Sequence, residues 1–233
     1  MGIMTPYFPV EMALKLAKKA QADTFIETGT YMGGTSKWAS AQFKKVHTIE
    51  LSESLYNQTK GELLLKGNIT PHLGDSRDVL PEILQNVKDN AVFWLDGHYS
   101  AGVTAGKDDP CPLLKELEII LCRNNEDIII IDDARCLLGC AGWPSIFELY
   151  KKVESLAAND KFITICDDNI YIIPDDDKYK QDLLAYTLER NAALWNKINS
   201  GRKPSKIEKT IKLLKITGLY KPARAVYRRF KKK

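Results

Sequence analysis

The chain has 233 residues, which suits one α/β domain with an appendage and is long enough to bury a sizeable core. Apolar residues make up 44% and charged residues 27%, as in ordinary globular proteins, and no apolar run approaches the roughly 18 residues that a membrane-spanning helix needs. The net charge of +4 combines 13 Lys or Arg and one acid in residues 201–233 with 21 basic and 29 acidic residues before them, so the two parts are expected to meet different partners.

The first half of the chain alternates helical patterns with short apolar segments. Helical spacing over residues 10–20, after Pro9, predicts a first helix. Strands are predicted at 23–27, 46–50, 69–73 and 91–95. Between them we expect a helix through Trp38 and Phe43, a helix capped by Ser52, and a helix through 79–83. This alternation is typical of parallel strands with right-handed crossovers.

The second half continues the pattern and then changes it. A helix is predicted at 112–121, a strand at 127–131 and a helix at 146–153. Segments 162–166 and 170–174, separated by Asp-Asp-Asn, predict a closing β-hairpin. The run of four isoleucines at 128–131 favours a strand covered on both faces. We therefore predict a mostly parallel sheet with helices on both faces and with ligands at the carboxyl ends of its strands.

A glycine-rich turn follows the first strand, with the sequence Glu27-Thr28-Gly29-Thr30-Tyr31-Met32-Gly33-Gly34. Glycines let a ligand approach the backbone closely or let the chain adopt a positive φ. The spacing G-x-x-x-G-G is not the dinucleotide pattern G-x-G-x-x-G, and a carboxylate at Glu27 would repel a pyrophosphate. A cationic ligand without phosphate fits better, and S-adenosylmethionine (SAM) carries both a sulfonium and an ammonium. A turn of this kind on its own also occurs without any ligand.

Polar residues also end the next two strands. Glu50 ends the second strand, where a carboxylate can accept hydrogen bonds from both ribose hydroxyls of a nucleotide. Asp75 and Ser76 follow the third strand and are placed to serve an adenine amino group. A single glutamate at a strand end is often only a solvated cap, so the prediction depends on the order of these residues at consecutive strand ends.

Three aspartates end the fourth and fifth strands. They are Asp96, Asp132 and Asp133. Adjacent parallel strands lie about 4.8 Å apart, so the three carboxylates are expected to converge, and they would repel one another unless a cation joined them. Oxygen ligands suit Mg²⁺, Ca²⁺ or Mn²⁺, and a small substrate with open water positions favours Mg²⁺ or Mn²⁺. The alternative is that Asp132 and Asp133 cap the following segment and that Asp96 begins a turn.

His98, two residues beyond Asp96, is the candidate general base, because its ordinary pKa near 6.5 suits that role. The alternative is a structural hydrogen-bond partner. Four further side chains are candidates for shaping a substrate pocket: Trp94, Tyr99, Arg135 and Trp143. Core packing suits Trp94 better, and Arg135 has many acids with which to pair.

These segments resemble class I SAM-dependent methyltransferases, and in the site residues catechol O-methyltransferase. The pattern that this family carries around its cofactor falls on Glu27, Gly29, Tyr31 and Thr35, its ribose carboxylate on Glu50, and its adenine-side serine on Ser76. Its metal ligands fall on Asp96, Asp132 and Asp133. The family's catalytic lysine would be Tyr99 here, which puts the base in doubt, and residues 100–112 look longer than the family's loop. The stretch from Leu95 to Leu117 looks closer still to the metal-dependent O-methyltransferases of macrolide sugars and glycans.

The resemblance implies a Rossmann-like, mostly parallel seven-stranded sheet that ends in a β-hairpin strand. Residues 1–175 would form the methyltransferase domain with helix 10–20 packed on it, residues 176–200 a helical extension, and residues 201–233 a basic amphipathic tail. The cofactor contacts that we predict are Glu27, Gly29, Thr30, Tyr31, Gly33, Thr35, Glu50, Asp75, Ser76 and Asp96. Catalysis would rest on His98 and Asp96, with one Mg²⁺ or Mn²⁺ on Asp96, Asp132 and Asp133. The expected acceptor is a small molecule or glycan with neighbouring hydroxyls.

The tail and the cysteines bear on location. Five cysteines without a C-x-x-C pair predict reduced thiols in a cytoplasmic protein, and the N-terminus lacks the regions of a signal peptide. Basic residues interleaved with apolar ones in 201–233 are typical of contact with an anionic membrane at its inner face, and also of nucleic-acid binding or of a solvated helix docked on the acidic part. Nucleic acid is the less favoured partner, and an oligomer is compatible with the sequence.

Two other functions stay open. A nicotinamide-dependent oxidoreductase would use a related sheet, but the missing G-x-G-x-x-G and the position of Glu27 disfavour it. A non-catalytic nucleic-acid-binding module would account for the tail, but it would leave Asp96, Asp132 and Asp133 without a purpose.

Overall fold

The computed structural model describes residues 8–98, 111–157 and 160–200. The chain forms two compact units, Met1–Leu188 and Glu189–Lys233. The predicted tail contact with a membrane falls on residues 201–233, which lie outside the described part. The described portion contains no helix that is both long enough and apolar enough to span a bilayer.

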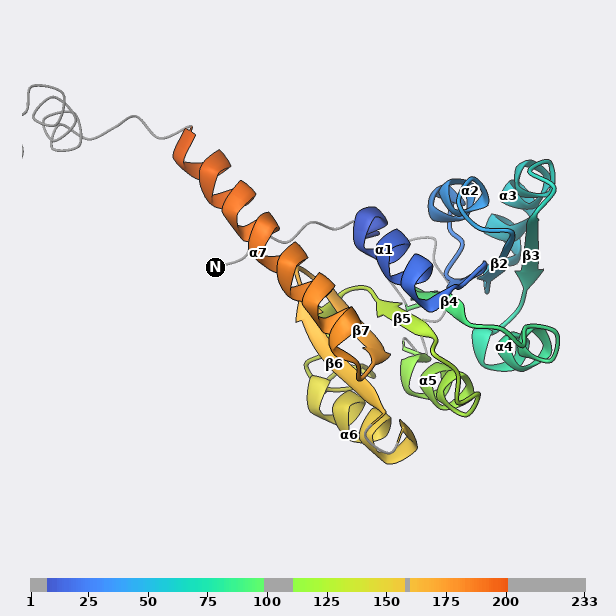
Figure 1. Ribbon diagram of the computed structural model, residues 1–233. Helices are drawn as coiled ribbons and strands as arrows, with labels where there is room; N and C mark the ends of the chain where they lie inside the picture. Colours follow the sequence, from blue (N-terminus) through green and yellow to red (C-terminus); the bar gives the residue numbers. More distant parts are fainter. Residues whose placement is uncertain (1–7, 99–110, 158–159, 201–233) are drawn as a thin grey trace, which may run out of the picture. The chain divides into compact units, whose positions relative to one another are not determined.

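One seven-stranded sheet organises the first unit (Figure 1). Its strands are β1 (Thr24–Thr28), β2 (Lys45–Glu50), β3 (Ile69–Leu73), β4 (Ala91–Leu95), β5 (Ile128–Ile131), β6 (Lys161–Cys166) and β7 (Asn169–Pro174), in the order β3-β2-β1-β4-β5-β7-β6. The first five strands are parallel, and β7 runs antiparallel between β5 and β6. The predicted mostly parallel sheet with a closing hairpin is therefore confirmed.

Helices cover both faces of this sheet. They are α1 (Val10–Ala20), α2 (Gly34–Ser40), α3 (Glu53–Leu64), α4 (Ser76–Leu84), α5 (Leu113–Leu121), α6 (Ile146–Ala157) and α7 (Asp177–Ser200). One buried cluster joins α1, α2, α3 and the first turns of α7 to one face, and a second cluster joins α4, α5 and α6 to the other (Figure 1). Ile128 and Ile130 enter the first cluster while Ile129 and Ile131 enter the second, which accounts for a strand that is apolar at every position.

Helix α1 packs on the sheet through one face. Its buried residues are Met12, Ala13, Leu16, Ala17 and Ala20, which follow helical spacing. Tyr179 and Leu183 of α7 belong to the same cluster, and the hydroxyl group of Tyr179 donates a hydrogen bond to Glu126 at 2.9 Å. The start of α7 is therefore part of the first unit.

One predicted element ends earlier than expected. The sequence predicted a helix through Trp38 and Phe43, but α2 ends at Ser40, so Phe43 lies beyond it. The ring of Phe43 packs against Phe25 with centroids 5.2 Å apart, and the backbone N–H of Lys44 donates to the carbonyl of Asp23 at 2.9 Å. Phe43 is apolar because it packs in the core at the turn into β2. In the sequence its position continues the spacing of the helix, which is why the helix was predicted to reach it.

Candidate active site

The carboxyl ends of β1, β2, β4 and β5 meet at one edge of the sheet and bring the predicted residues with them. The first contact is between backbones. The N–H groups of Gly29 and Thr30 donate to the carbonyl of Ile49 at 2.9 and 3.2 Å, and the N–H of Asp96 donates to the carbonyl of Thr28 at 3.0 Å. The glycine-rich turn is thereby joined to the ends of both neighbouring strands.

Two glycines of this turn adopt positive φ. Gly29 has φ +87°, and a β-carbon on it would lie 2.3 Å from the carbonyl oxygen of Asp96. Gly33 has φ +69° and precedes α2 as its N-cap. Between them Tyr31 has φ 46° and leaves its side chain 54% exposed. The turn therefore leaves its backbone and the Tyr31 side chain accessible at the carboxyl edge of the sheet, where ligands bind in such folds.

Glu27 turns its carboxylate into the protein. It is 2% exposed and accepts hydrogen bonds from the hydroxyl groups of Ser36 and Thr48, the latter at 2.7 Å. Burial raises the pKa of Glu27 to about 7, although these hydroxyl groups lower it. Thr30 is buried beside it and shares a hydrogen bond with Thr48 at 2.6 Å. Thr35, in the first turn of α2, is half-buried and also lowers the pKa of Glu27.

Glu50 anchors the turn on the β2 side. One of its carboxylate oxygens accepts from the backbone N–H of Tyr31 at 2.8 Å, and the other accepts from that of Ser52 at 2.9 Å. Glu50 is 6% exposed and lies at the carboxyl end of β2. This hydrogen bond brings Glu50 and Tyr31 together, and their contact with a cofactor stays a prediction.

Asp75 and Ser76 begin α4. The Asp75 carboxylate caps this helix by accepting from the backbone N–H of Arg77 at 2.9 Å, and it also pairs with the Arg77 guanidinium. These bonds hold the pKa of Asp75 below its usual range. Ser76 is 8% exposed.

His98 is held between carboxylates. Its Nε2 lies 2.9 Å from Oδ2 of Asp133 and 3.6 Å from Oδ1 of Asp96. Burial lowers the pKa of His98, but the hydrogen bond to Asp133 and the charge of Asp96 outweigh it, so the pKa lies above its ordinary value. The Trp143 ring packs against the imidazole with centroids 4.7 Å apart. Asp133 therefore orients the imidazole of His98, and the Trp143 ring packs against it.

The two aspartates that follow β5 differ in the direction of their pKa shifts. Burial raises the pKa of Asp132, whereas the hydrogen bond from His98 lowers the pKa of Asp133. Asp133 has φ 55°, and its backbone N–H donates to Oδ1 of Asp132 at 2.8 Å. Burial raises the pKa of Asp96 to about 7, and Asp132 and Asp133 add to that rise.

An acidic group that could hold a cation includes a residue that the sequence did not indicate. Carboxylate oxygens of Asp132, Asp133 and Asp168 come within 4.8 Å of one another, and Asp96 is not a member of this group. The guanidinium of Arg135 contacts both Asp133, at 2.6 Å, and Asp168. The expectation that Arg135 pairs with acids agrees with this geometry, while Asp96 as a metal ligand stays a prediction.

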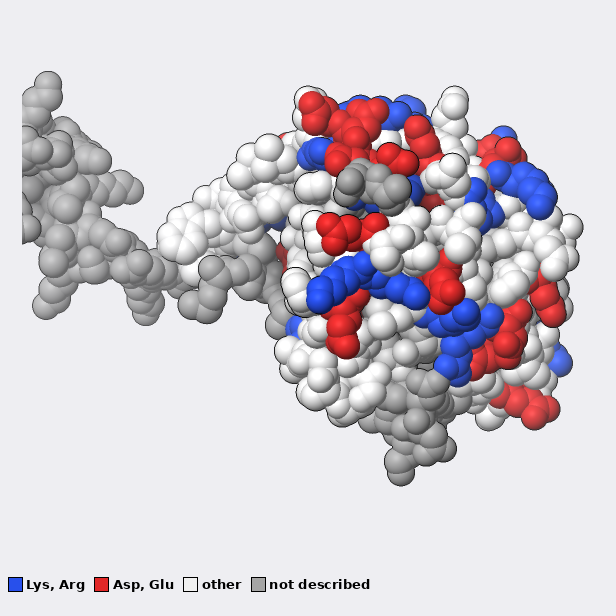
Figure 2. Space-filling view, turned by 90° about the horizontal axis from the view of Figure 1, so that it is seen from below, with Lys and Arg blue, Asp and Glu red and all other residues white. Residues whose placement is uncertain are grey.

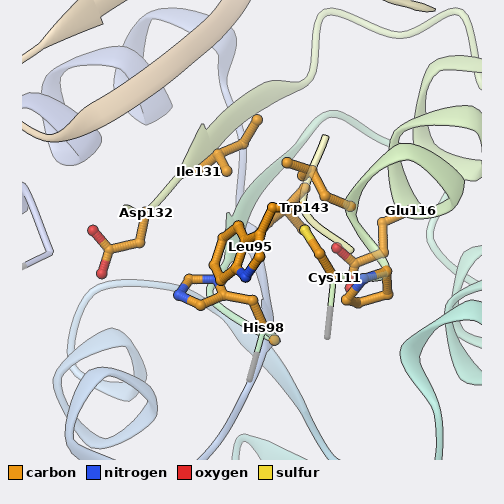
Figure 3. Close-up of a pocket in the computed structure, with 10 residues that line it drawn as sticks. Leu95, His98, Cys111, Glu116, Ile131, Asp132 and Trp143 are labelled. Carbon is orange, nitrogen blue, oxygen red and sulfur yellow. The ribbon is translucent and has the colours of Figure 1, made fainter. Parts of the chain in front are cut away.

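A small pocket opens beside His98 (Figure 3). Its lining consists of Leu95, Gly97, His98, Cys111, Pro112, Leu113, Glu116, Ile131, Asp132 and Trp143. Trp143 lines this pocket, and its contact with an acceptor stays a prediction. Trp94 is 2% exposed in the core, and Tyr99 lies outside the described residues. Glu116 was not predicted, although it occupies the apolar stripe of α5 with Leu113, Leu117 and Ile120.

Comparison with known proteins identifies the class of fold. The sequence matches no protein-family model and no curated protein. Among solved structures, a candidate methyltransferase from Streptococcus mutans, in complex with S-adenosylhomocysteine (SAH), matches with a TM-score of 0.52 and 15% identity over 73% of this chain and 99% of that one. The chain has the Rossmann-like fold of class I methyltransferases.

Two further solved structures match with lower scores. A candidate caffeoyl-CoA O-methyltransferase from Staphylococcus aureus has a TM-score of 0.45 and 16% identity over 73% of this chain and 86% of that one. An rRNA methylase from Streptococcus thermophilus has a TM-score of 0.44 and 15% identity over 73% and 98%.

The buried state of Glu27 leads to a testable pH dependence. Because its folded pKa of about 7 lies above the ordinary value of 4.5, the stability that Glu27 contributes is fully present below pH 4.5 and is lost as the pH rises through 7. Glu27→Gln keeps a neutral side chain at every pH. We expect the variant to gain on the wild type by on the order of 1–3 kcal/mol between pH 5 and pH 8, measured by urea unfolding. If the two proteins differed by the same free energy of unfolding at every pH in this range, the raised pKa of Glu27 would be contradicted.

Proposed function

We propose that the protein transfers a methyl group from SAM to a hydroxyl group of a sugar in a glycan or glycoconjugate. One observation carries the proposal. In a class I methyltransferase fold, His98 follows the end of β4, close to the glycine-rich turn, and its imidazole is held by Asp133. A base beside a cleft suited to a cationic methyl donor fits removal of a hydroxyl proton coupled to methyl transfer.

The cofactor contacts follow from the strand ends. We place the ribose against Glu50 and the aminoacyl end against the turn from Gly29 to Gly33, near Glu27 and Asp96. Asp75 and Ser76 stand at the start of α4, on the adenine side. The carboxylates of Glu27 and Asp96, both with pKa values of about 7, would become charged most easily next to a cation, and the donor carries two.

The chemistry of the proposed step uses one base and one orienting acid. Bound SAM supplies a methyl group on a sulfonium. His98 takes the proton of the acceptor hydroxyl, the acceptor oxygen bonds to the methyl carbon, and the carbon–sulfur bond breaks to leave SAH and a methyl ether. Asp133 orients the imidazole and stabilises the imidazolium that forms. Because an oxyanion and a sulfonium neutralise each other, a pocket that excludes water favours the step.

The proposal also includes a divalent metal ion. The donors present are carboxylates, which suit Mg²⁺ or Mn²⁺, and the oxygens of Asp132, Asp133 and Asp168 are close enough to share one cation. We propose that Asp132 and Asp133 hold it, with Asp96 from the adjacent strand. When bound, such a metal lowers the pKa of a coordinated hydroxyl group.

The metal assignment is tested by Asp132→Asn, which keeps the shape of the side chain and removes its charge. We expect the affinity for Mn²⁺ to fall by about tenfold or more, and metal-stimulated transfer with it, because the variant loses one anionic ligand. Affinity for SAH should stay nearly unchanged. Calorimetric titration with MnCl₂ and with SAH measures both. Asp23→Asn, at an exposed ion pair before β1, is the control. Normal transfer by wild type in the presence of a chelator would remove the metal from the proposal.

The acceptor is tested by a methyl-transfer screen. SAH formation is measured over sugars and catechols, with and without Mg²⁺ or Mn²⁺. Support for a sugar comes from the likeness of the sequence of residues 95–117 to sugar O-methyltransferases. Transfer to catechols with no transfer to any sugar would move the proposal to an aromatic acceptor.

The alternative functions predict different ligands. An oxidoreductase would bind NAD and not SAH, which calorimetry with both ligands decides. A nucleic-acid-binding module would shift RNA in a salt-sensitive way, and the shift would be lost when residues 201–233 are removed. On the face of the protein in Figure 2, basic and acidic side chains are interspersed, so this face offers no advantage to a polyanion.

A further inference from the structure

Glu116 is a buried acid that the proposed chemistry does not use. It lies in the first turn of α5, is 1% exposed, and lines the pocket opposite Asp132 (Figure 3). Within the described residues its Oε1 has no hydrogen-bond partner. A buried polar atom without a partner is costly, so such an atom at the wall of a pocket points to a ligand.

The surroundings of Glu116 belong to the proposed cofactor cleft. A β-carbon on Gly97, directly after Asp96, would lie 3.0 Å from Oγ1 of Thr28 and 3.5 Å from Oε1 of Glu116. The absence of a side chain at Gly97 therefore leaves both polar atoms close to the backbone at the end of β4. Oγ1 of Thr28 likewise lacks a hydrogen-bond partner in the part of the chain that the structure describes.

The missing partner of Oε1 narrows the kind of ligand. A carboxylate oxygen accepts hydrogen bonds, so the ligand has to bring a donor to it. Burial raises the pKa of Glu116, and the nearby hydroxyl groups of Ser76 and Thr28 offset only part of that rise. The 6-amino group of adenine is a donor of this kind.

Asp75, the acid on the adenine side, is already engaged. Both of its oxygens accept hydrogen bonds from Arg77. Ser76, the next residue, is close enough to Glu116 to affect its pKa, so Glu116 and the start of α4 face the same place.

We propose that Glu116 binds the adenine of SAM, its Oε1 accepting a hydrogen bond from the 6-amino group. This inference rests on SAM being the donor in the proposed function. It adds a residue from α5 to a cofactor site otherwise built from the ends of β1, β2, β3 and β4.

The test compares SAH with its 6-deamino analogue, in which purine replaces adenine, by calorimetry on the full chain. Wild type should bind SAH about tenfold or more tightly than the analogue, because one hydrogen bond in a buried site is lost. Glu116→Gln should keep this preference, since the amide oxygen can still accept from the 6-amino group. Glu116→Leu should bind SAH about tenfold more weakly and should no longer distinguish the two ligands. Glu118→Gln, at an ion-paired residue on the same helix, is the control and should match wild type.

The outcomes separate this inference from the proposed function. If wild type binds neither ligand, the methyltransferase proposal fails and the inference with it. If wild type binds SAH but does not prefer it over the analogue, or if Glu116→Leu keeps the full preference, only the role of Glu116 is overturned. The wild-type comparison decides even if the leucine variant does not fold.

Discussion

Replacing Gly29 by alanine is expected to weaken SAH binding by about ten- to a hundred-fold. The added β-carbon would lie 2.3 Å from the carbonyl oxygen of Asp96 and 3.1 Å from the Cα of Gly97, at a φ of +87°. A strained φ alone costs about 1–3 kcal/mol. Because both close neighbours are backbone, relief requires the glycine-rich turn or the end of β4 to move. Both segments carry proposed cofactor contacts, so binding is lost together with stability.

Calorimetry with SAH measures the affinity, and urea unfolding measures the cost to stability. Gly34→Ala is the matched control, since Gly34 begins α2 and an added β-carbon there meets nothing within 4 Å. The control should bind SAH as wild type does and should be as stable or slightly more stable, because alanine favours a helix over glycine. SAH binding of wild-type strength by Gly29→Ala would mean that the cofactor does not depend on this turn.

Much of the fold could be predicted because its strands are covered on both faces. The four isoleucines of β5 pack into two helix layers, and a strand with one face in water would have alternated apolar and polar residues instead. The hairpin of β6 and β7 was also predictable from two apolar segments separated by a polar turn. The end of α2 was not, because the position of Phe43 is decided by its packing against Phe25 and not by helical spacing.

The site could be predicted only where strand ends determine it. Asp96 and Asp132 end neighbouring parallel strands, so their proximity follows from the sheet. Asp168 lies in the hairpin turn, and it approaches Asp133 because β7 pairs with β5 in the antiparallel sense. That pairing brings the carbonyl of Asp168 to the backbone N–H of Ala134, at 2.8 Å. No local pattern in the sequence contains this information.

Glu116 shows the same limit within a helix. In the segment Leu-Leu-Lys-Glu-Leu-Glu the residues Glu116 and Glu118 look alike, yet one is buried and the other pairs with Lys115 and Lys152. The apolar stripe of α5 does contain Glu116, and an acid on such a stripe is a signal that sequence reasoning can use.

The second large effect is expected at His98. With the acceptor identified by the screen, His98→Gln should lower kcat by about 10²- to 10⁴-fold, the usual contribution of a general base. Glutamine can still bond to Asp133 but cannot take up the hydroxyl proton. Affinity for SAH, measured by calorimetry, should stay close to that of wild type, because the loss concerns proton transfer and not binding of the donor.

The pH profile separates a base from a structural histidine. Only neutral His98 can accept a proton, and Asp133 and Asp96 hold its pKa above the ordinary 6.5. Activity of the wild type should therefore rise with pH along a limb that lies above pH 6.5, and this limb should be absent from the residual activity of His98→Gln.

His72→Gln on the edge strand β3 is the matched control and should leave both kcat and the pH profile unchanged, since His72 pairs with His47 away from Asp133. A residual His98→Gln activity that keeps the wild-type limb would assign the titration to another group. Full activity of His98→Gln would show that His98 is not the base. The base would then be one of the carboxylates around it. Asp96 would be the first of these to replace, because its pKa of about 7 also permits proton uptake near neutral pH.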